Sequence, residues 1–287
     1  MFEIRDRIRF TKMSGSGNDF IIIDNRQLKL KKEQGRELAR LACRRKISVG
    51  ADGLILIEDD TGADFKWQFF NADGSEAEMC GNGARCAARF ALLKGIVAGP
   101  QMSFRTLAGL IEAEVRGERA KVRMTPPHGY EIDIPVKLEN CLLNLDFINT
   151  GVPHAVFFAQ SESQLDEIDV FGLGRSIRFH KRFEPAGSNA DFVYVRGPHN
   201  LAIRTYERGV EAETLACGTG AIAGALTAAA RDFVTSPVDV RTMSGESLII
   251  YFEKSLQEGE KVFSDVYLEG DVKVVYDGEL WDETLRG

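Results

Sequence analysis

The sequence has no excess of basic side chains: its 36 lysine and arginine residues are outnumbered by 43 aspartate and glutamate residues, giving a formal net charge of −7. Binding along a phosphate backbone requires a basic surface, so nucleic-acid binding is excluded as the main task. An acidic protein can still bind a small anionic or zwitterionic molecule, because a local pocket of backbone N–H groups is sufficient. We therefore expect a small-molecule ligand and no nucleic-acid partner.

Long apolar runs are also missing, and no secretory leader is expected. Residues 1–7 contain no apolar stretch of the kind that a secretory signal requires. The longest uncharged run lies between Glu213 and Arg231, and it is too short and too weakly apolar to span a membrane. We expect a cytoplasmic protein with no membrane partner.

Patterns for metals and common cofactors are scarce. The 287 residues include only four histidines and five cysteines, with no Cys-x-x-Cys pair and no His-Glu-x-x-His spacing. In a reducing compartment, five cysteines do not indicate a disulfide framework. Gly15-Ser16-Gly17 has no third glycine in register, and no Gly-Lys-Ser/Thr is present, so a nucleotide site is not expected. We expect neither a metal nor a cofactor.

What the sequence does contain is a cysteine–glycine motif that occurs twice. Cys80-Gly81-Asn82-Gly83 and Cys217-Gly218-Thr219-Gly220 each precede an Ala-rich segment with helical spacing. A Gly-rich turn that opens a helix leaves backbone N–H groups pointing outward, and the positive helix end lowers the pKa of a nearby thiol. Each motif therefore predicts an anion pocket with a proton acceptor on its rim. The pair predicts two thiols, one that takes a proton and one that gives a proton.

Features of the first half recur in the second at spacings of 136 to 139 positions. The matched pairs are Asn18 and His154, Asp52 and Asp191, and Cys80 and Cys217. Such near-constant spacing predicts a duplication and two lobes of like fold. We expect an N-terminal lobe of residues 1–125 plus about 276–287 and a C-terminal lobe of residues 126–275, with Pro126-Pro127 as the linker.

The fold class follows from the short strands and the two Ala-rich helices. A helix that is apolar nearly all round is buried, so each lobe is expected to wrap a strongly curved, mostly antiparallel sheet around one such helix. This is an α+β architecture of two pseudo-symmetric lobes. The three cysteines outside the motif, Cys43, Cys86 and Cys141, are predicted to be core residues.

Seven stretches together carry a resemblance to a known family. They are Phe10–Phe20, Phe70–Ser75, Met79–Cys86, Gly151–His154, Gly187–Asn189, Tyr206–Gly209 and Ala216–Ala221. With them the chain resembles the diaminopimelate epimerases, which belong to the two-cysteine racemases that work without pyridoxal phosphate. The resemblance implies an isomerase that interconverts LL- and meso-diaminopimelate in lysine and peptidoglycan precursor biosynthesis. It also implies a homodimer and an active site between the lobes.

The resemblance assigns roles residue by residue. It implies that Cys80 and Cys217 are the catalytic thiols, and we expect His154 and Glu207 to support them. The residues expected to bind substrate are Asn18, Asn71, Gly81, Asn82, Asn189, Glu207, Arg208, Gly218 and Thr219. Two positions depart from the family pattern, since Gly53 and Val152 replace a Gln and an Asn that some members carry.

Other functions remain open at this stage. A proline or hydroxyproline racemase uses the same pair of thiols, although Asn82 and the Glu207-Arg208 pair favour diaminopimelate. An isomerase of the same fold with a carboxylate in place of the first thiol is disfavoured by Cys80. A redox or metal-binding protein would use the two cysteines differently, and two cysteines without nearby histidines make a poor metal site. A non-catalytic amino-acid-binding module has no need of two thiols.

Overall fold

A computed structural model describes residues 7–139, 141–257 and 260–285. These residues form two compact units, one up to Val122 and again from Gly270, the other Arg123–Glu269. The chain crosses between the units within β7 (Arg119–Arg123) and β16 (Glu260–Asp271), so the first crossing lies a few residues before the expected linker at Pro126-Pro127. Residues 1–6, over which no leader is predicted, lie outside the part that the structure describes.

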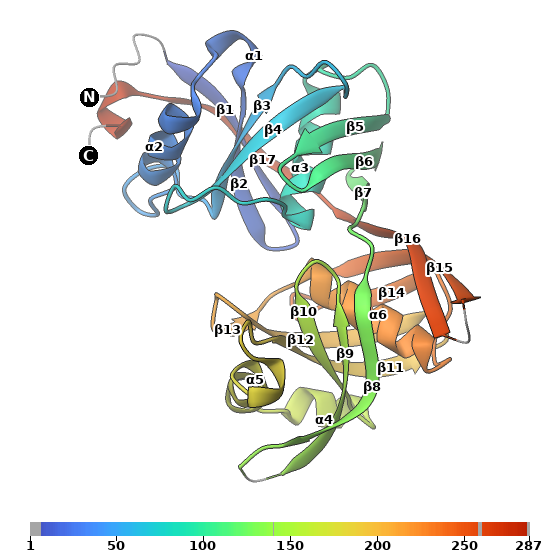
Figure 1. Cartoon of the computed structure of the whole chain (residues 1–287). Coiled ribbons are helices and arrows are strands. Elements are labelled where there is room, and N and C mark those ends of the chain that lie inside the picture. Colours follow the sequence, from blue (N-terminus) through green and yellow to red (C-terminus); the bar gives the residue numbers. More distant parts are fainter. Residues whose placement is uncertain (1–6, 140, 258–259, 286–287) are drawn as a thin grey trace. The chain divides into compact units, whose positions relative to one another are not determined.

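The first unit is a sheet with helices on both faces (Figure 1). The β1–β2 hairpin is antiparallel, β2 pairs in parallel with β3, and β4 and β17 extend the sheet. Its elements are β1 (Ile8–Gly15), β2 (Asn18–Asp24), α1 (Asn25–Leu28), α2 (Lys32–Ala42), β3 (Gly53–Glu58), β4 (Phe65–Asn71), α3 (Gly81–Leu93), β5 (Gln101–Thr106), β6 (Gly109–Arg116), β7, β17 (Lys273–Leu280) and the 3-10 helix η2 (Asp282–Leu285).

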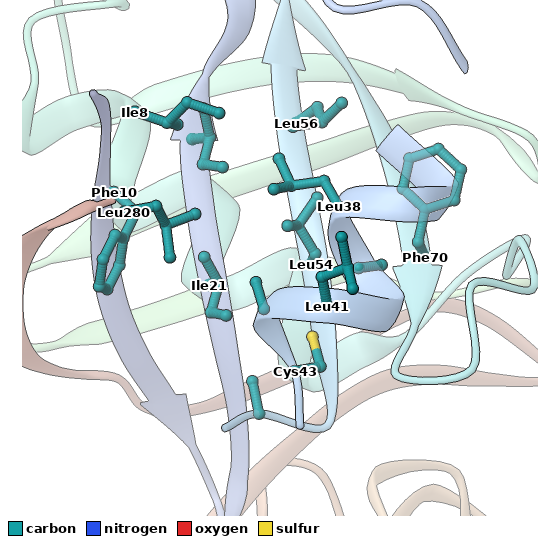
Figure 2. Close-up of a cluster of buried hydrophobic side chains, with 14 residues drawn as sticks. Ile8, Phe10, Ile21, Leu38, Leu41, Cys43, Leu54, Leu56, Phe70 and Leu280 are labelled. Atoms are coloured by element: carbon teal, nitrogen blue, oxygen red, sulfur yellow. The ribbon is translucent and has the colours of Figure 1, made fainter. Parts of the chain in front are cut away.

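Strands β2 and β3 are buried on both faces, as continuous apolar strands between two layers should be. On one face, Ile21 and Leu54 pack with Leu38 of α2 in the cluster that Figure 2 shows. Cys43, which follows α2, lies in the same cluster, and burial raises the pKa of its thiol to about 12. The prediction of a core role for Cys43 is therefore confirmed. On the other face, Ile55 lies against Gly83 in the first turn of α3.

The second unit repeats this order of pairings. Strands β9 and β10 are antiparallel, β10 and β11 parallel, and β11 and β12 antiparallel, as β1 to β4 are in the first unit. Its elements are β8 (His128–Lys137), β9 (Leu142–Asn149), β10 (Pro153–Phe158), α4 (Glu162–Glu167), α5 (Val170–Arg178), η1 (Lys181–Phe183), β11 (Asn189–Gly197), β12 (Asn200–Glu207), β13 (Ala212–Thr214), α6 (Gly218–Ala230), β14 (Val238–Arg241), β15 (Ser247–Gln257) and β16.

The helices that follow the cysteines have the same place in both units. Helices α3 and α6 each have 13 residues. Helix α3 follows β4, the fourth strand of this order, and α6 follows β12 and the short strand β13, which pairs antiparallel with β12. Helix α6 contacts strands on several sides, and every residue from Gly220 to Ala230 is buried (Figure 1). The prediction of an α+β fold with a buried Ala-rich helix and mostly antiparallel pairing is confirmed.

Two predictions about the second half were wrong or incomplete. Cys141 is exposed and precedes β9, so it is not a core residue as expected. The sequence analysis also missed β8. Tyr130, Ile132, Ile134 and Val136 alternate along it as in a strand, but the prolines at 126, 127 and 135 argue against one. Cys86, by contrast, is fully buried as predicted.

Candidate active site

Cys80 lies at the N-cap of α3. Its backbone is extended, with φ −145° and ψ 117°, and the helix begins at Gly81. The Cys80 carbonyl accepts the first helical hydrogen bond, from Ala84 N at 2.8 Å. The N–H groups of the first turn have no partner within a helix, so they are suited to bind an anion beside a partly exposed thiol.

A chain of hydrogen bonds runs beside this turn. Arg85 Nη2 lies 2.9 Å from Asn82 Oδ1, Asn82 Nδ2 donates to Asn18 Oδ1 at 2.6 Å, and Asn18 Nδ2 donates to Asp52 Oδ2 at 3.1 Å. Arg45 binds the other oxygen of Asp52 at 2.9 Å. The structure thus brings the predicted Asn18 and Asn82 into direct contact.

Asn71 makes its own hydrogen bond at the end of β4. It ends β4 opposite Gly53, is exposed, and its Nδ2 donates to Ser75 Oγ at 3.0 Å. A side chain at position 53 would collide with the ring of Phe69, 2.5 Å from an added Cβ. The phenyl ring therefore leaves no room for a side chain at position 53 without a shift.

Cys217 has the equivalent place at the N-cap of α6, with φ −118° and ψ 113°. It is buried, and its Sγ lies 3.4 Å from Thr219 Oγ1. The Thr219 carbonyl accepts a hydrogen bond from Thr150 Oγ1 at 3.0 Å, which anchors the loop. Gly220 must be glycine, because an added Cβ would lie 2.5 Å from Asp191 Oδ1.

The electrostatic setting of Cys217 differs from the expectation of a lowered thiol pKa. Burial raises the pKa of Cys217 well above its ordinary value, and the carboxylates of Glu207 and Asp191 raise it further. Thr219 and the Gly220 backbone offset only part of this shift. The helix end is therefore outweighed by desolvation and by two acidic neighbours, which raise the pKa of Cys217 and favour its protonated form.

Glu207 ends β12, close to Cys217. Burial raises the pKa of its carboxyl group, while Thr214 and the His154 ring lower it again in part. Asp191 acts in the same direction as burial, since two carboxylates disfavour each other's charge. Glu207 and Cys217 thus form a neighbouring pair in which both groups retain protons more strongly than usual.

His154 belongs to a second hydrogen-bonded chain. Its Nδ1 lies 2.6 Å from Asp191 Oδ2, and Asn189 Nδ2 approaches its Nε2 at 3.3 Å. Asn189 Oδ1 accepts from the Arg208 backbone N–H at 2.7 Å, which fixes the amide with Nδ2 toward the imidazole. The proton of His154 is therefore on Nδ1, and its Nε2 is engaged by Asn189.

Arg208 is held at both ends. Its backbone N–H contacts Asn189, and its guanidinium donates through Nη1 to the Ala186 carbonyl at 3.2 Å. The remaining donors of the guanidinium suit a carboxylate. The structure therefore brings together the predicted residues His154, Asn189 and Arg208, with Glu207 adjacent in the chain.

Three residues that contribute to these sites were not predicted as site residues, although Asp52 and Asp191 were matched as a repeat pair. Arg85 and Asp191 are fully buried charged side chains, and Asp52 receives the hydrogen bond from Asn18. The sequence did contain signals for two of them: an arginine in an Ala-rich helix and an aspartate at the start of an apolar strand. A buried charge usually has a structural or functional partner.

Within residues 7–139, 141–257 and 260–285, no group of three or more His, Cys, Asp or Glu side chains is arranged to hold a metal ion. None of the helices in that part of the chain has the length and apolar character needed to cross a membrane.

Solved structures with this fold define its class. A phenazine biosynthesis protein of the PhzF family from Bacillus anthracis superposes with a TM-score of 0.74 at 15% identity, over 96% of this chain and 99% of that one. A hydroxyproline epimerase from Agrobacterium vitis superposes with a TM-score of 0.71 at 15% identity, over 97% and 94% of the two chains. The fold is therefore that of the PhzF proteins and the proline racemase-like epimerases.

Sequence comparison gives the family within this class. The family model for diaminopimelate epimerase matches residues 10–129 and 147–273. The chain is 47% identical to a diaminopimelate epimerase of Aquifex aeolicus (strain VF5), over 97% of this chain and all of that one. It is 48% identical to one of Hydrogenobaculum sp. (strain Y04AAS1), over 94% and 97% of the two chains. The chain belongs to the diaminopimelate epimerase family.

Proposed function

We propose that this protein interconverts LL- and meso-diaminopimelate by moving the α-proton between two cysteines, without a cofactor. The observation that carries the proposal is the duplication: each unit presents a cysteine at the N-cap of a buried 13-residue helix, after the same order of strands. Membership of the diaminopimelate epimerase family supports the choice of substrate. The enzyme would serve lysine and peptidoglycan precursor synthesis.

The two thiols have different starting states in this mechanism. Cys217 is protonated, because burial and two carboxylates raise its pKa. Cys80 then takes the α-proton as a thiolate, its S–H bond forming as the C–H bond breaks. Cys217 gives its proton to the opposite face of the same carbon and becomes the thiolate. The reverse reaction uses the same groups with the roles exchanged.

Stabilisation of the carbanion is the harder part of this reaction. Without an electron sink, negative charge moves onto the substrate carboxylate as the proton leaves. The backbone N–H groups at Gly81-Asn82 and Gly218-Thr219 are suited to receive it, since oriented donors in a site with little water need no reorganisation. Asn18, Asn71, Asn189 and Arg208 would bind the polar groups of the substrate away from the reacting carbon.

Isotope transfer tests the proposal. LL-diaminopimelate is incubated with the enzyme in heavy water, and the first product is analysed. Two bases predict that each inverted molecule carries one deuterium at the inverted carbon, while unreacted LL substrate stays unlabelled. Cys80→Ala and Cys217→Ala should each lower epimerisation by at least about 10²-fold, as expected when a general acid or base is lost. Wild-type rates in both variants would refute the mechanism.

The hydroxyproline epimerase similarity raises a second substrate class. At 15% identity it shows the fold alone, and hydroxyproline is bound by that protein. Membership of the diaminopimelate epimerase family favours a substrate with two amino-acid ends. Assays with proline and hydroxyproline beside LL-diaminopimelate separate the two, because turnover of the ring compounds alone would overturn the choice of substrate.

Three further features belong to the same proposal. The enzyme is proposed to act in the cytoplasm, since free thiols used as acid and base need a reducing compartment. It is proposed to work without pyridoxal phosphate, which hydroxylamine treatment would test by leaving activity unchanged. A homodimer is proposed from the family resemblance, and sedimentation equilibrium at twice the 31.8 kDa chain mass would support it.

A further inference from the structure

Arg85 is a fully buried cation in the first unit, on the second turn of α3. Its Nη2 contacts Ser16 Oγ at 2.8 Å and Asn82 Oδ1 at 2.9 Å. Ser16 lies in the tight turn between β1 and β2, and Gly15 of that turn packs against the Asn82 carbonyl, 3.1 Å from where a Cβ would be. The guanidinium therefore joins the β1–β2 turn to the loop that follows Cys80.

The chain of hydrogen bonds that begins at Arg85 has a fixed direction. A guanidinium has donors only, so the atom of Asn82 that faces it must be the oxygen Oδ1. Asn82 Nδ2 is then turned to Asn18 Oδ1, and Asn18 Nδ2 to Asp52. An ionised carboxylate has acceptors only, so the far end demands the same orientation. Neither amide can flip without placing two donors or two acceptors against each other.

The orientation decides what the asparagines offer to a ligand. Each Nδ2 has two hydrogens, and the chain uses one on Asn18 and one on Asn82. Neither Nδ2 has a second acceptor among the described residues. Asn82 lies two residues after the partly exposed Cys80, and Asn18 contacts Asn82. An oxygen acceptor such as a carboxylate satisfies these donors, whereas an ammonium group does not.

We propose that Arg85 and Asp52 are positioning residues that hold Asn18 and Asn82 with their N–H groups presented to a carboxylate of the substrate. The inference rests on the proposed function for the identity of that substrate. Neither charged residue touches the reacting atoms in this proposal, since both act through the two amides.

Kinetics of four full-length variants test it: Arg85→Met, Arg85→Lys, Asp52→Asn and Arg89→Met. Arg85→Met removes one end of the hydrogen-bond chain, and Asp52→Asn replaces the acceptor-only carboxylate at the other end with an amide that can also donate. We expect KM for LL-diaminopimelate to rise about tenfold or more in both, with kcat changed less. Arg85→Lys keeps a charged donor and should keep KM within about threefold of wild type. Arg89, one turn further along α3, binds the Val272 carbonyl instead, and Arg89→Met is the matched control for loss of a mostly buried arginine.

The double variant Arg85→Met/Asp52→Asn gives the sharper result. Because both residues act on one chain of hydrogen bonds, the KM of the double variant should not exceed the higher of the two single-variant KM values by much. Multiplied effects in the double variant, an unchanged KM in Arg85→Met, or an equal rise in Arg89→Met would overturn the inference. Wild-type turnover tests the proposed function, and the ratios of variant to wild-type KM test this inference, so the two can fail separately.

A measurement without turnover completes the test. In ¹⁵N spectra of the wild type, the side-chain amide hydrogens of Asn18 and Asn82 should exchange slowly with solvent. Arg85→Met should speed that exchange for both residues at an unchanged melting temperature, and Arg89→Met should not. Equal protection in the wild type and Arg85→Met would refute the positioning role even if the enzyme proved to act on another substrate.

Discussion

The carboxylate of Asp191 lies 2.6 Å from Nδ1 of His154, and both side chains are fully buried. Asp191 also accepts a hydrogen bond from Thr205 Oγ1 at 2.7 Å. A carboxylate acceptor places the His154 proton on Nδ1, which leaves Nε2 to accept from Asn189. His154 therefore orients Asn189, and through it the Arg208 backbone.

Replacing Asp191 tests this role of the imidazole. Asp191→Ala leaves the buried Nδ1–H without an acceptor, so we expect kcat/KM to fall about 100-fold and the free energy of unfolding to fall by about 2 kcal/mol. Asp191→Asn retains a neutral acceptor and should lose about tenfold in kcat/KM. Thr205→Val keeps the His154–Asp191 hydrogen bond and serves as the control. Wild-type kcat/KM in Asp191→Ala would contradict the assignment.

Cys217 should be a slow nucleophile until its acidic neighbour is removed. Because burial, Glu207 and Asp191 raise its thiol pKa, we expect iodoacetamide at pH 7.5 to alkylate it more slowly than glutathione. Glu207→Gln removes one of the two negative charges, so the pKa of Cys217 falls and its alkylation quickens several-fold. Mass spectrometry of the modified peptide measures both rates. A slower reaction in Glu207→Gln would show that the carboxylate assists the thiolate.

Stability should respond to pH through Glu207. Burial raises the pKa of its carboxyl group above the ordinary 4.5, so the folded protein binds this proton more tightly than the unfolded chain. The associated stability is present below the unfolded value and is lost as the pH rises through the folded value. Glu207→Gln lacks this loss. The difference in unfolding free energy between the variant and the wild type, measured with urea, should therefore grow from pH 4.5 upward in favour of the variant.

The sequence predicted the parts of the site that depend on local pattern. A cysteine followed by Gly-x-Gly and an Ala-rich run determines a helix start, and both starts lie where expected, at Gly81 and Gly218. The repeat spacing likewise matched Asn18 with His154. Asn18 is hydrogen-bonded to Asp52, directly before the parallel strand β3, and His154 to Asp191 within the parallel strand β11.

Contacts between distant strands were not predictable in the same way. The direction of the Arg85–Asn82–Asn18 chain depends on the pairing of β1, β2 and α3, which no local window contains. The raised pKa of Cys217 also depends on packing, since desolvation and Glu207 overcame the helix end that the sequence suggested. The prediction for Cys141 was wrong because it relied on local pattern alone. An apolar run at the end of a hairpin does not have to be buried.

The glycine at the third position after each cysteine offers a test with an internal control. At Gly220 an added Cβ would lie 2.5 Å from Asp191 Oδ1 and 3.1 Å from Thr205 Oγ1, so Gly220→Ala should push the aspartate from His154. Overpacking of this kind costs about 1–3 kcal/mol. At Gly83 the nearest atom is Ile55 Cδ1 at 3.4 Å, an ordinary contact.

Gly83→Ala should therefore leave the free energy of unfolding unchanged or raise it by up to about 1 kcal/mol, because alanine favours a helix over glycine. Denaturant unfolding of both variants measures the difference directly. The same substitution at equivalent helix positions separates the helix propensity from the contact with Asp191. Equal stability of the two variants would mean that the first turn of α6 is free to move away from the aspartate, and that Gly220 is not required for the approach.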